Sequence, residues 1–377
     1  MSPTNRRRRK QPLGRRIRKA LRKKLRALRN RLLRYIKANK FKSFLIGLTA
    51  VLILVMLLVP RGGSSLESYE GYTHNARFEE DVIVNGIDVS YSQGNGIDWN
   101  DVKKSGVDFA FIRAGYRAAQ TGKIHKDDLL EQHAKGAQDA GLMTGYYFFS
   151  QALTMEEAKE EARKLLEYTE GYDPSLPYVI DLETFGNGRQ TQAILNRTLG
   201  AMDLYLIADA FCSVIEEAGY DTMVYGNYDF LTHYADGEFL GNRTHIWLAH
   251  YHHKTSYPHG YSYWQASESG SIVGIDGAVD LDFWYLDPSK PIYSTDQSSQ
   301  NRTSLTECNV SLRDHSPKLR FGIAEPGVVV KDGFRTLEEG KDYVCGYVHN
   351  TANGTGYAVV TGIGDYKDTV TTSFLIR

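Results

Sequence analysis

The sequence predicts an α/β protein in which a closed barrel follows an N-terminal transmembrane helix and precedes a small all-β domain. Three patterns support this prediction. An uncharged apolar run lies near the start of the chain, directly after a basic segment. The middle of the chain alternates strand-like with helix-like segments, and its end holds only short strand-like runs separated by Gly and Asn turns. With 377 residues, the chain is long enough for two folded units and additional segments.

The first 42 residues form a basic tail, although the formal net charge of the whole chain is zero. This tail holds 19 Lys and Arg and no Asp or Glu, which leaves 26 basic and 45 acidic residues for the remainder. Apolar residues recur in it at helical spacing, namely Ile17, Leu21, Leu25, Leu28, Leu32 and Ile36. Such a helix would lie on the anionic inner leaflet of the cytoplasmic membrane, and an exaggerated topology signal is an equally weighted alternative. No nucleic-acid partner is expected, because charge alone does not indicate one.

Residues 43–60 are expected to form a transmembrane signal anchor. The run is uncharged and rich in Leu, Val and Ile, and its length is near the lower limit for a membrane-spanning helix. It ends in Met56–Pro60 without a small-residue cleavage site, so we expect it to be retained. The basic tail predicts a single-pass protein of the cell membrane, with its N-terminus in the cytoplasm and everything after Arg61 outside. Residues 61–80, with Gly and Ser followed by acids, are interpreted as a linker.

Residues 81–290 are expected to form the barrel. The strand candidates are Val82–Tyr91, Phe109–Tyr116, Met143–Ser150, Tyr178–Thr184, Thr222–Asn227, His245–Tyr251, Tyr261–Ala266 and Val279–Tyr285. The helical candidates lie between the earlier strands, at Lys126–Ala140, Met155–Thr169 and Leu199–Ala218. This order predicts a closed α/β barrel with a simplified second half, and such barrels carry their chemistry at the carboxyl ends of the strands.

Carboxylates gather at the ends of three of these strands. Asp88 ends the first strand, Asp181 and Glu183 end the fourth, and Asp280 lies in the eighth. Asp181 and Glu183 are two residues apart, so their side chains point the same way and lie roughly 6–7 Å apart. Burying neighbouring carboxyl groups separates their pKa values, which gives the protonated acid and the ionised group that glycoside hydrolysis requires. A strand that ends in solvent is the alternative explanation for any one acid.

Aromatic side chains accompany these acids along the later strands. They are Tyr147, Tyr225, Trp247, Tyr251 and Trp264. Any single one of them would be interpreted as core packing in a barrel. Because several fall beside the acids, and because aromatic rings beside carboxylates suit the faces and hydroxyls of sugars, the pattern favours a carbohydrate-binding cleft.

Roughly residues 83–287 resemble the glycoside hydrolase family 25 lysozymes, the Chalaropsis-type muramidases. The matching segments occur in the order of that family and are Gly86–Ser90, Phe111–Gly115, Gly145–Phe149, Asp181–Glu183, Tyr225–Tyr228, Trp247–Tyr251, Trp264–Gln265 and Val279–Asp280. The chain departs from the family at Phe148, where many members have His, and at Asp282, where Asn is common. Both departures could alter substrate preference, and neither removes a catalytic carboxylate.

The resemblance implies an irregular TIM-type barrel of five β/α units followed by three strands. It also implies hydrolysis, with retention, of the β-1,4 bond between N-acetylmuramic acid and N-acetylglucosamine in peptidoglycan. Glu183 would be the general acid, and the other catalytic carboxylates would be Asp181, Asp88 and Asp280. The expected substrate-binding residues are Tyr147, Tyr225, Trp247, Tyr251, Trp264 and Gln265. Whether an enzyme carboxylate or the acetamido group of the substrate is the nucleophile is left open.

No cofactor or metal is expected, because no Cys/His cluster has zinc spacing and no phosphate-binding Gly loop is present. The run of His250, His252 and His253 is better explained as a loop at a strand end. A peptidoglycan-binding or scaffold protein without catalytic activity remains the alternative to a hydrolase. The combination of four carboxylates favours the hydrolase, since a binding protein does not need all of them.

After a polar linker at residues 291–304, residues 305–377 are expected to form the small all-β domain. Its Gly, Tyr and Asp pattern resembles the Ig-like modules of bacterial surface proteins, which implies either wall attachment or a spacer without a ligand. Cys308 and Cys345 both fall in this domain and could pair outside the cell, whereas Cys212 lies in an apolar helix. The spacing of the cysteines does not decide the pairing.

Overall fold

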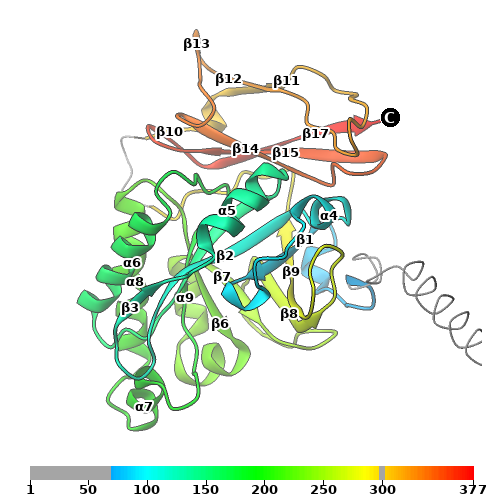
Figure 1. The fold of residues 1–377 in the computed structure, drawn as a ribbon. Helices are drawn as coiled ribbons and strands as arrows, with labels where there is room; N and C mark the ends of the chain where they lie inside the picture. Colours follow the sequence, from blue (N-terminus) through cyan, green and yellow to red (C-terminus); the bar gives the residue numbers. More distant parts are fainter. Residues whose placement is uncertain (1–68, 297–301) are drawn as a thin grey trace, which may run out of the picture. The chain divides into compact units, whose positions relative to one another are not determined.

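The computed structural model describes residues 69–296 and 302–377. Eight strands form a closed barrel (Figure 1). In chain order they are β1 (Val82–Val89), β2 (Phe109–Arg117), β4 (Met143–Phe149), β5 (Tyr178–Asp181), β6 (Thr222–Asn227), β7 (His245–Ala249), β8 (Tyr263–Gly270) and β9 (Val279–Leu286). The barrel closes because β1 pairs with both β9 and β2. A short strand, β3 (Ile124–Lys126), pairs with the end of β2 and lies outside the closed ring.

The predicted TIM-type barrel is wrong, because the last strand runs in the opposite direction to the others. All eight strands of a TIM-type barrel are parallel. Here β9 is antiparallel to β8 and to β1, while the other neighbouring pairs of the ring are parallel. Only a short connection joins β8 to β9, and such a connection permits an antiparallel hairpin but not a parallel crossover. The barrel is therefore a mixed α/β barrel.

Helices cover the outside of the barrel. In chain order they are α4 (Trp99–Lys104), α5 (Leu130–Asp139), α6 (Met155–Tyr168), α7 (Arg189–Leu195), α8 (Ala201–Glu217) and α9 (Gly237–Arg243). Three of them begin at side chains that accept a backbone N–H bond, Asp98 for α4, Thr154 for α6 and Asp236 for α9. Within the described residues, the connections after β7 and β8 contain no helix, which explains the simplified second half.

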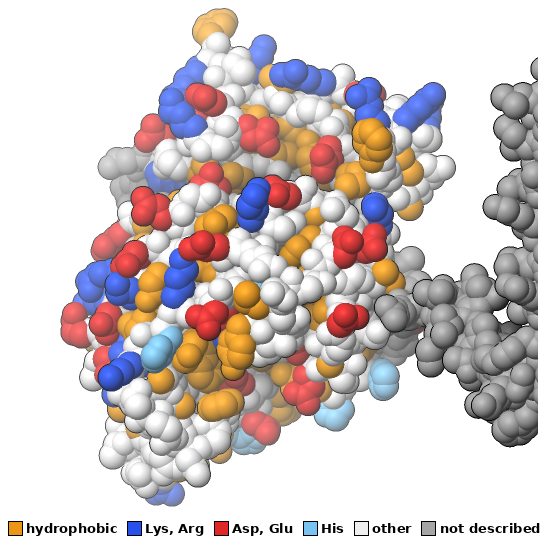
Figure 2. All heavy atoms as spheres, in the orientation of Figure 1, with side chains coloured by type: hydrophobic (Ala, Val, Ile, Leu, Met, Phe, Trp, Pro, Cys, Tyr) orange, Lys and Arg blue, Asp and Glu red, His pale blue; other side chains and the backbone are white. Residues whose placement is uncertain are grey.

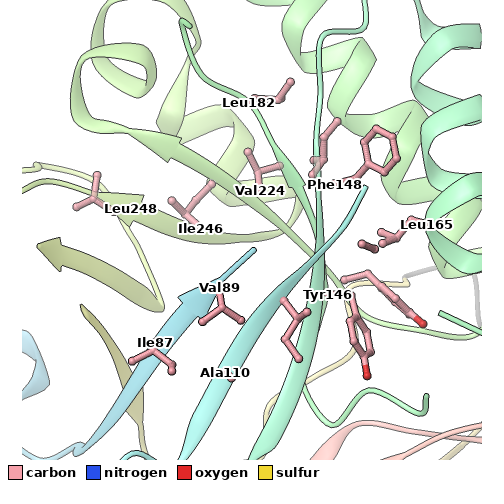
Figure 3. Packing of buried hydrophobic residues seen from close by; sticks show 14 of the residues in the cluster. Ile87, Val89, Ala110, Tyr146, Phe148, Leu165, Leu182, Val224, Ile246 and Leu248 are labelled. Carbon is pink, nitrogen blue, oxygen red and sulfur yellow. The ribbon is translucent and has the colours of Figure 1, made fainter. Parts of the chain in front are cut away.

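Along each strand, side chains point alternately outward to the helices and inward to the barrel interior. Outward side chains such as Ile87, Phe148 and Leu248 pack into one large apolar cluster with the helices (Figure 3). Inward side chains form a second cluster inside the barrel. Gly86 makes room for an inward ring, because a Cβ there would lie 2.1 Å from the ring of Phe109. Small residues thus let large rings fill the interior.

Residues 302–377 form an all-β module with its own core. Its strands are β10 (Thr303–Ser304), β11 (Asn309–Leu312), β12 (Val328–Asp332), β13 (Arg335–Thr336), β14 (Tyr343–Val348), β15 (Gly354–Gly362), β16 (Tyr366–Lys367) and β17 (Thr369–Ile376). They pair as β14–β15–β17, β11–β12–β13 and β10–β16. The resemblance to Ig-like modules remains a prediction. Cys212, Cys308 and Cys345 are all free thiols, so the possible Cys308–Cys345 bridge is not formed.

The module contacts the amino-terminal end of the barrel. Val348 and Val359 of the module belong to the same apolar cluster as the side chains that fill the barrel interior. The backbone of Gly346 approaches the barrel so closely that a Cβ there would lie 2.3 Å from Met143 Cγ. The segment after β9, expected to be a linker, is anchored as well, since Ile292 forms a β-bridge with Thr369. The module is thus packed against the barrel by apolar and backbone contacts.

The prediction of a single-pass membrane protein with a transmembrane helix is not upheld. Across residues 69–296 and 302–377, none of the helices is both long enough and apolar enough to span a bilayer. The segment expected to do so, residues 43–60, lies outside the described residues, as does the basic tail of residues 1–42. On the surface that the structure describes, acidic and basic side chains are interspersed over the face shown in Figure 2.

Candidate functional site

A cleft of about 480 Å³ opens at the carboxyl ends of the parallel strands. It is lined by all four acids expected from the sequence, Asp88, Asp181, Glu183 and Asp280. Five of the six expected substrate-binding residues line it too: Tyr147, Tyr225, Trp247, Tyr251 and Gln265. The structure therefore brings together residues from seven strands and from the loops that follow two of them.

The strand geometry explains how the four acids meet. Asp88 near the end of β1 lies opposite Asp280 near the start of β9, because these two strands are antiparallel. Asp181 is the last residue of β5, and Glu183 follows two residues later. Leu182 between them is fully buried in the cluster outside the barrel. The alternation of side chains therefore directs both acids into the cleft, as the sequence predicted.

Burial is the main influence on the pKa values of these acids. It raises the pKa of Asp88 to about 6, of Glu183 to about 7 and of Asp280 to about 8, and repulsion from the neighbouring carboxylates adds to each. The pKa of Asp181 is also raised by burial, and then by the charges of Glu183 and Asp88. Glu183 and Asp280 therefore favour the protonated form in a mildly acidic solution, in which Asp88 begins to ionise.

Arg113 on β2 is the cation whose charge acts on Asp88 and Asp181, and it lowers the pKa of both. Its guanidinium is held by Asp127, with a distance of 2.8 Å from Nε to Oδ2. Its Cζ atom lies 4.8 Å from the centre of the Tyr91 ring. Arg113 was not predicted from the sequence as a site residue, although it lies inside the family-like segment Phe111–Gly115. The alternation of β2 could have placed it on the inner face, two residues after Phe111.

A hydrogen-bond network holds Asp88 in position. The hydroxyls of Tyr225 and Tyr251 both donate to Gln265 Oε1, at 2.8 and 3.0 Å. These two donors fix the orientation of the amide, because only its oxygen can accept them. The Nε2 atom of Gln265 then faces Asp88 and donates to its Oδ2 at 2.5 Å. Gln265 therefore links two tyrosines of the cleft to one of its acids.

Aromatic rings form the floor and the rim of the cleft. Trp247 is buried at the floor, stacked on Phe111 at 4.5 Å and edge-on to Tyr225 at 4.7 Å between ring centres. At the rim, Tyr91 and Phe185 are 54% and 55% exposed, although both are large aromatic residues. These two rim residues were not predicted from the sequence. Their position in loops gave no periodic signal, although Tyr91 directly follows the segment Gly86–Ser90.

The structure does not bring Trp264 to the cleft. Its side chain is fully buried in the cluster outside the barrel, where it packs against Tyr72 and Phe283. Its Nε1–H donates to the carbonyl oxygen of His250. Since Gln265 faces inward, the preceding residue of the same strand must face outward. The expectation that both Trp264 and Gln265 bind substrate was therefore inconsistent with strand alternation.

The described residues include no group of three or more His, Cys, Asp or Glu arranged to hold a metal ion. The acids of the cleft are surrounded instead by aromatic rings and hydrogen-bond donors. Chemically, this arrangement can donate a proton from one carboxyl group and stabilise positive charge with another. Those are the two requirements of glycoside hydrolysis.

Comparison with known proteins agrees with this geometry. The family model for glycosyl hydrolases family 25 matches residues 87–275, which is half of the chain. The autolytic lysozyme of Clostridium acetobutylicum is 29% identical over 203 residues, which cover 53% of this chain and 55% of that protein. Lysozyme M1 of Streptomyces globisporus is 26% identical over 205 residues, covering 52% of this chain and 66% of the relative. The matched region thus spans 55% of the length of the first relative and 66% of the second.

Among solved structures, a family 25 glycosyl hydrolase from Bacillus anthracis is similar to this chain, with 22% sequence identity and a TM-score of 0.46. The match covers 57% of this chain and 92% of that chain.

Proposed function

The chain belongs to the glycosyl hydrolases of family 25, and we propose that it is a muramidase that hydrolyses peptidoglycan. The bond cut is the β-1,4 linkage between N-acetylmuramic acid and N-acetylglucosamine. One observation carries this proposal: carboxyl groups from three strands meet in an aromatic cleft, and Glu183 has a pKa of about 7. Two curated relatives with recognisable identity are lysozymes, which supports the choice of peptidoglycan as the substrate.

In the proposed mechanism, Glu183 is the general acid. Its proton moves to the glycosidic oxygen as the bond from that oxygen to the sugar C1 atom breaks. Positive charge then develops at C1 and is stabilised by the ionised carboxylate of Asp88, whose pKa is lower than those of Glu183 and Asp280. A water molecule supplies a hydroxyl to C1, and its proton returns to Glu183. Aromatic side chains such as Tyr147 and Trp247 form the surface on which the sugar rings lie.

The pKa values predict a narrow pH optimum. Glu183 must be protonated, so activity falls as the pH rises through about 7. Asp88 must be ionised, so activity also falls as the pH drops through about 6. We therefore expect a bell-shaped profile of kcat/KM with its maximum between these two values. A profile that is flat from pH 5 to pH 8 would contradict the assignment of both groups.

The decisive experiment is digestion of purified peptidoglycan, followed by reduction of the products with borohydride and mass spectrometry. A muramidase leaves N-acetylmuramic acid at the new reducing end, which reduction converts to muramitol. An enzyme that cuts the other glycosidic bond would leave N-acetylglucosamine there, and would overturn the bond assignment. The Glu183→Gln protein is the control. If the wild type released no sugars but still bound insoluble peptidoglycan, the alternative of a silent binding protein would replace the proposal.

A further inference from the structure

A fifth carboxyl group, that of Asp282, lies beneath the cleft and does not line it. It is on β9, two residues after Asp280, and its side chain is fully buried. Trp247 Nε1–H donates to its Oδ1 atom at 2.8 Å. No described residue donates to its other oxygen, Oδ2. The neighbouring side chain that can share a hydrogen bond with this carboxyl group is Asp88.

Two buried carboxylates cannot meet in this way if both are ionised. Each would repel the other in a region of low dielectric constant, and Asp282 Oδ2 would remain without a partner. A single proton between them removes both problems, because a protonated carboxyl group donates one hydrogen bond. Burial and the charges of Asp88 and Asp280 raise the pKa of Asp282 well above its ordinary value. The proton therefore resides on Asp282 and points to Asp88.

We propose that Asp282 is a positioning residue that acts as a neutral acid, with its O–H donating to the Asp88 carboxylate and holding it ionised beneath the sugar. This inference rests on the proposed hydrolase function for its effect on catalysis. Asp88 then receives two donors from two different strands, the Gln265 amide from β8 and the Asp282 carboxyl from β9. Both bonds lower the pKa of Asp88 and so oppose the effect of burial. The Asp88 carboxylate is the group that both strands orient.

On balance, the groups packed around Asp282 favour its neutral form. Asp88 on β1 and Asp280 on β9 act on it electrostatically, and both raise its pKa. From β7, the Trp247 N–H lowers the pKa, but this effect is smaller than that of the two acids. Tyr69 lies before β1, and its hydroxyl donates to the carbonyl oxygen of Gly86. Gly86 is the residue of β1 that pairs with Asp282 of β9. The largest influences on the pKa of Asp282 are burial, the two acids and the Trp247 N–H, and none of these is a cation.

The first test compares Asp282→Leu with Asp282→Asn. Leucine fills a similar volume but cannot donate, whereas the Asn amide can accept from Trp247 and donate to Asp88. We expect Asp282→Leu to lower kcat/KM by about 10- to 100-fold, the usual effect of losing a hydrogen bond to a charged group. The acid limb of its pH profile should move upward by about one unit, because Asp88 ionises less readily. Asp282→Asn should recover most of the lost activity and restore the position of the acid limb.

Folding is checked by thermal unfolding of each variant, and only folded variants enter the comparison. A folded Asp282→Asn protein that is as impaired as Asp282→Leu would show that donation to Asp88 is not the role of this residue. An Asp282→Leu protein whose acid limb stays in place would also overturn the proposal, since a purely structural residue changes the rate without moving that limb.

A second measurement does not depend on activity. Protonated carboxyl groups have an infrared C=O band that carboxylates lack. The wild-type minus Asp282→Asn difference spectrum at neutral pH in D₂O should therefore contain this band. Its absence would mean that Asp282 is ionised, and would overturn the proposal. Failure of the wild type to cut peptidoglycan would overturn the proposed function instead, while the infrared result would still decide where the proton lies.

Discussion

The two ends of the barrel are built from the same strands but treat charge in opposite ways. At the carboxyl end, Asp88 and Asp280 lie side by side on neighbouring strands, and the pKa of each is raised. At the amino end, the buried Asp108 is matched by a buried cation, with 2.8 Å between Lys103 Nζ and Asp108 Oδ1. Its second oxygen accepts a backbone N–H from His349 of the module. At the carboxyl end, acids lie beside other acids. At the amino end, the buried acid is paired with a cation and a backbone donor.

This difference separates chemistry from stability. Unmatched carboxyl groups cost folding free energy but give groups that can exchange protons near neutral pH. Paired charges and apolar contacts stabilise the fold but provide no group that exchanges protons near neutral pH. At the amino end, the module contributes to both, through the Tyr347 carbonyl oxygen bound to Lys103 and through its valines in the interior cluster. The module therefore closes the end of the barrel that carries no acids of the cleft. If this division is correct, substitutions at one end should change the rate, and substitutions at the other should change stability.

The largest effect is expected at the carboxyl end. Glu183→Gln keeps the shape of the side chain but removes the proton donor, so hydrolysis of peptidoglycan should fall by about 10²- to 10⁴-fold. The rate of release of reducing sugars measures this. Glu217→Gln is the matched control, because Glu217 is an exposed glutamate at the end of α8 and should be replaceable without loss. Near-normal hydrolysis by the Glu183→Gln protein would remove the central assignment of the cleft.

The next largest effect is expected at the amino end. Lys103→Met leaves the Asp108 charge buried beside the module without its cation, and should lower the free energy of unfolding by about 3 kcal/mol. Denaturant unfolding measures this, and kcat of the folded protein should not change. Lys104→Met is the matched control, since its neighbouring ion pair with Asp101 is exposed and should be worth under about 1 kcal/mol. A large loss of kcat in the Lys103→Met protein would show that the two ends are coupled.

A third prediction joins the two properties in one residue. The pKa of Glu183 is raised in the folded protein to about 7, from 4.5. Its contribution to stability is therefore complete below pH 4.5 and is lost as the pH rises through about 7. Because Glu183 is partly open to the cleft, we expect a loss of only ~1–2 kcal/mol. In urea unfolding, Glu183→Gln should match the wild type at pH 4 and exceed it at pH 8. If the two proteins were equally stable at both pH values, burial would not raise the pKa of Glu183.

Interior strands were the part of the fold most open to prediction. β6 has the predicted bounds, Thr222–Asn227, because strands buried on both faces appear as continuous apolar runs. β3 was missed because Ile124–Lys126 is too short and polar to give such a run. The direction of β9 was not predicted, because side-chain alternation is the same for both directions of a strand. The predicted strand end at Ala266 also left a connection long enough for a parallel crossover, whereas β8 continues to Gly270 and shortens it.

The acids of the site could be predicted from side-chain alternation, which places Asp181 and Glu183 on one face of their strand. The contacts of Asp88 were not, since they depend on which strands become neighbours. Gln265 and Asp282 reach Asp88 only because β9 lies between β8 and β1. This arrangement is a property of barrel closure and has no signature in local sequence.

The smallest effect concerns two exposed rings, one at the rim of the cleft and one in the module. Phe185 lines the rim of the cleft, and its ring lies edge-on to Phe149 at 5.4 Å between centres. Phe334 in the module is fully exposed and lies outside the cleft. Phe185→Ala should raise KM about 3- to 10-fold with little change in kcat, because an aromatic contact is worth about 0.5–1.5 kcal/mol. Phe334→Ala should change neither constant for soluble glycan fragments. Equal effects of the two substitutions would show that the rim of the cleft does not bind the glycan.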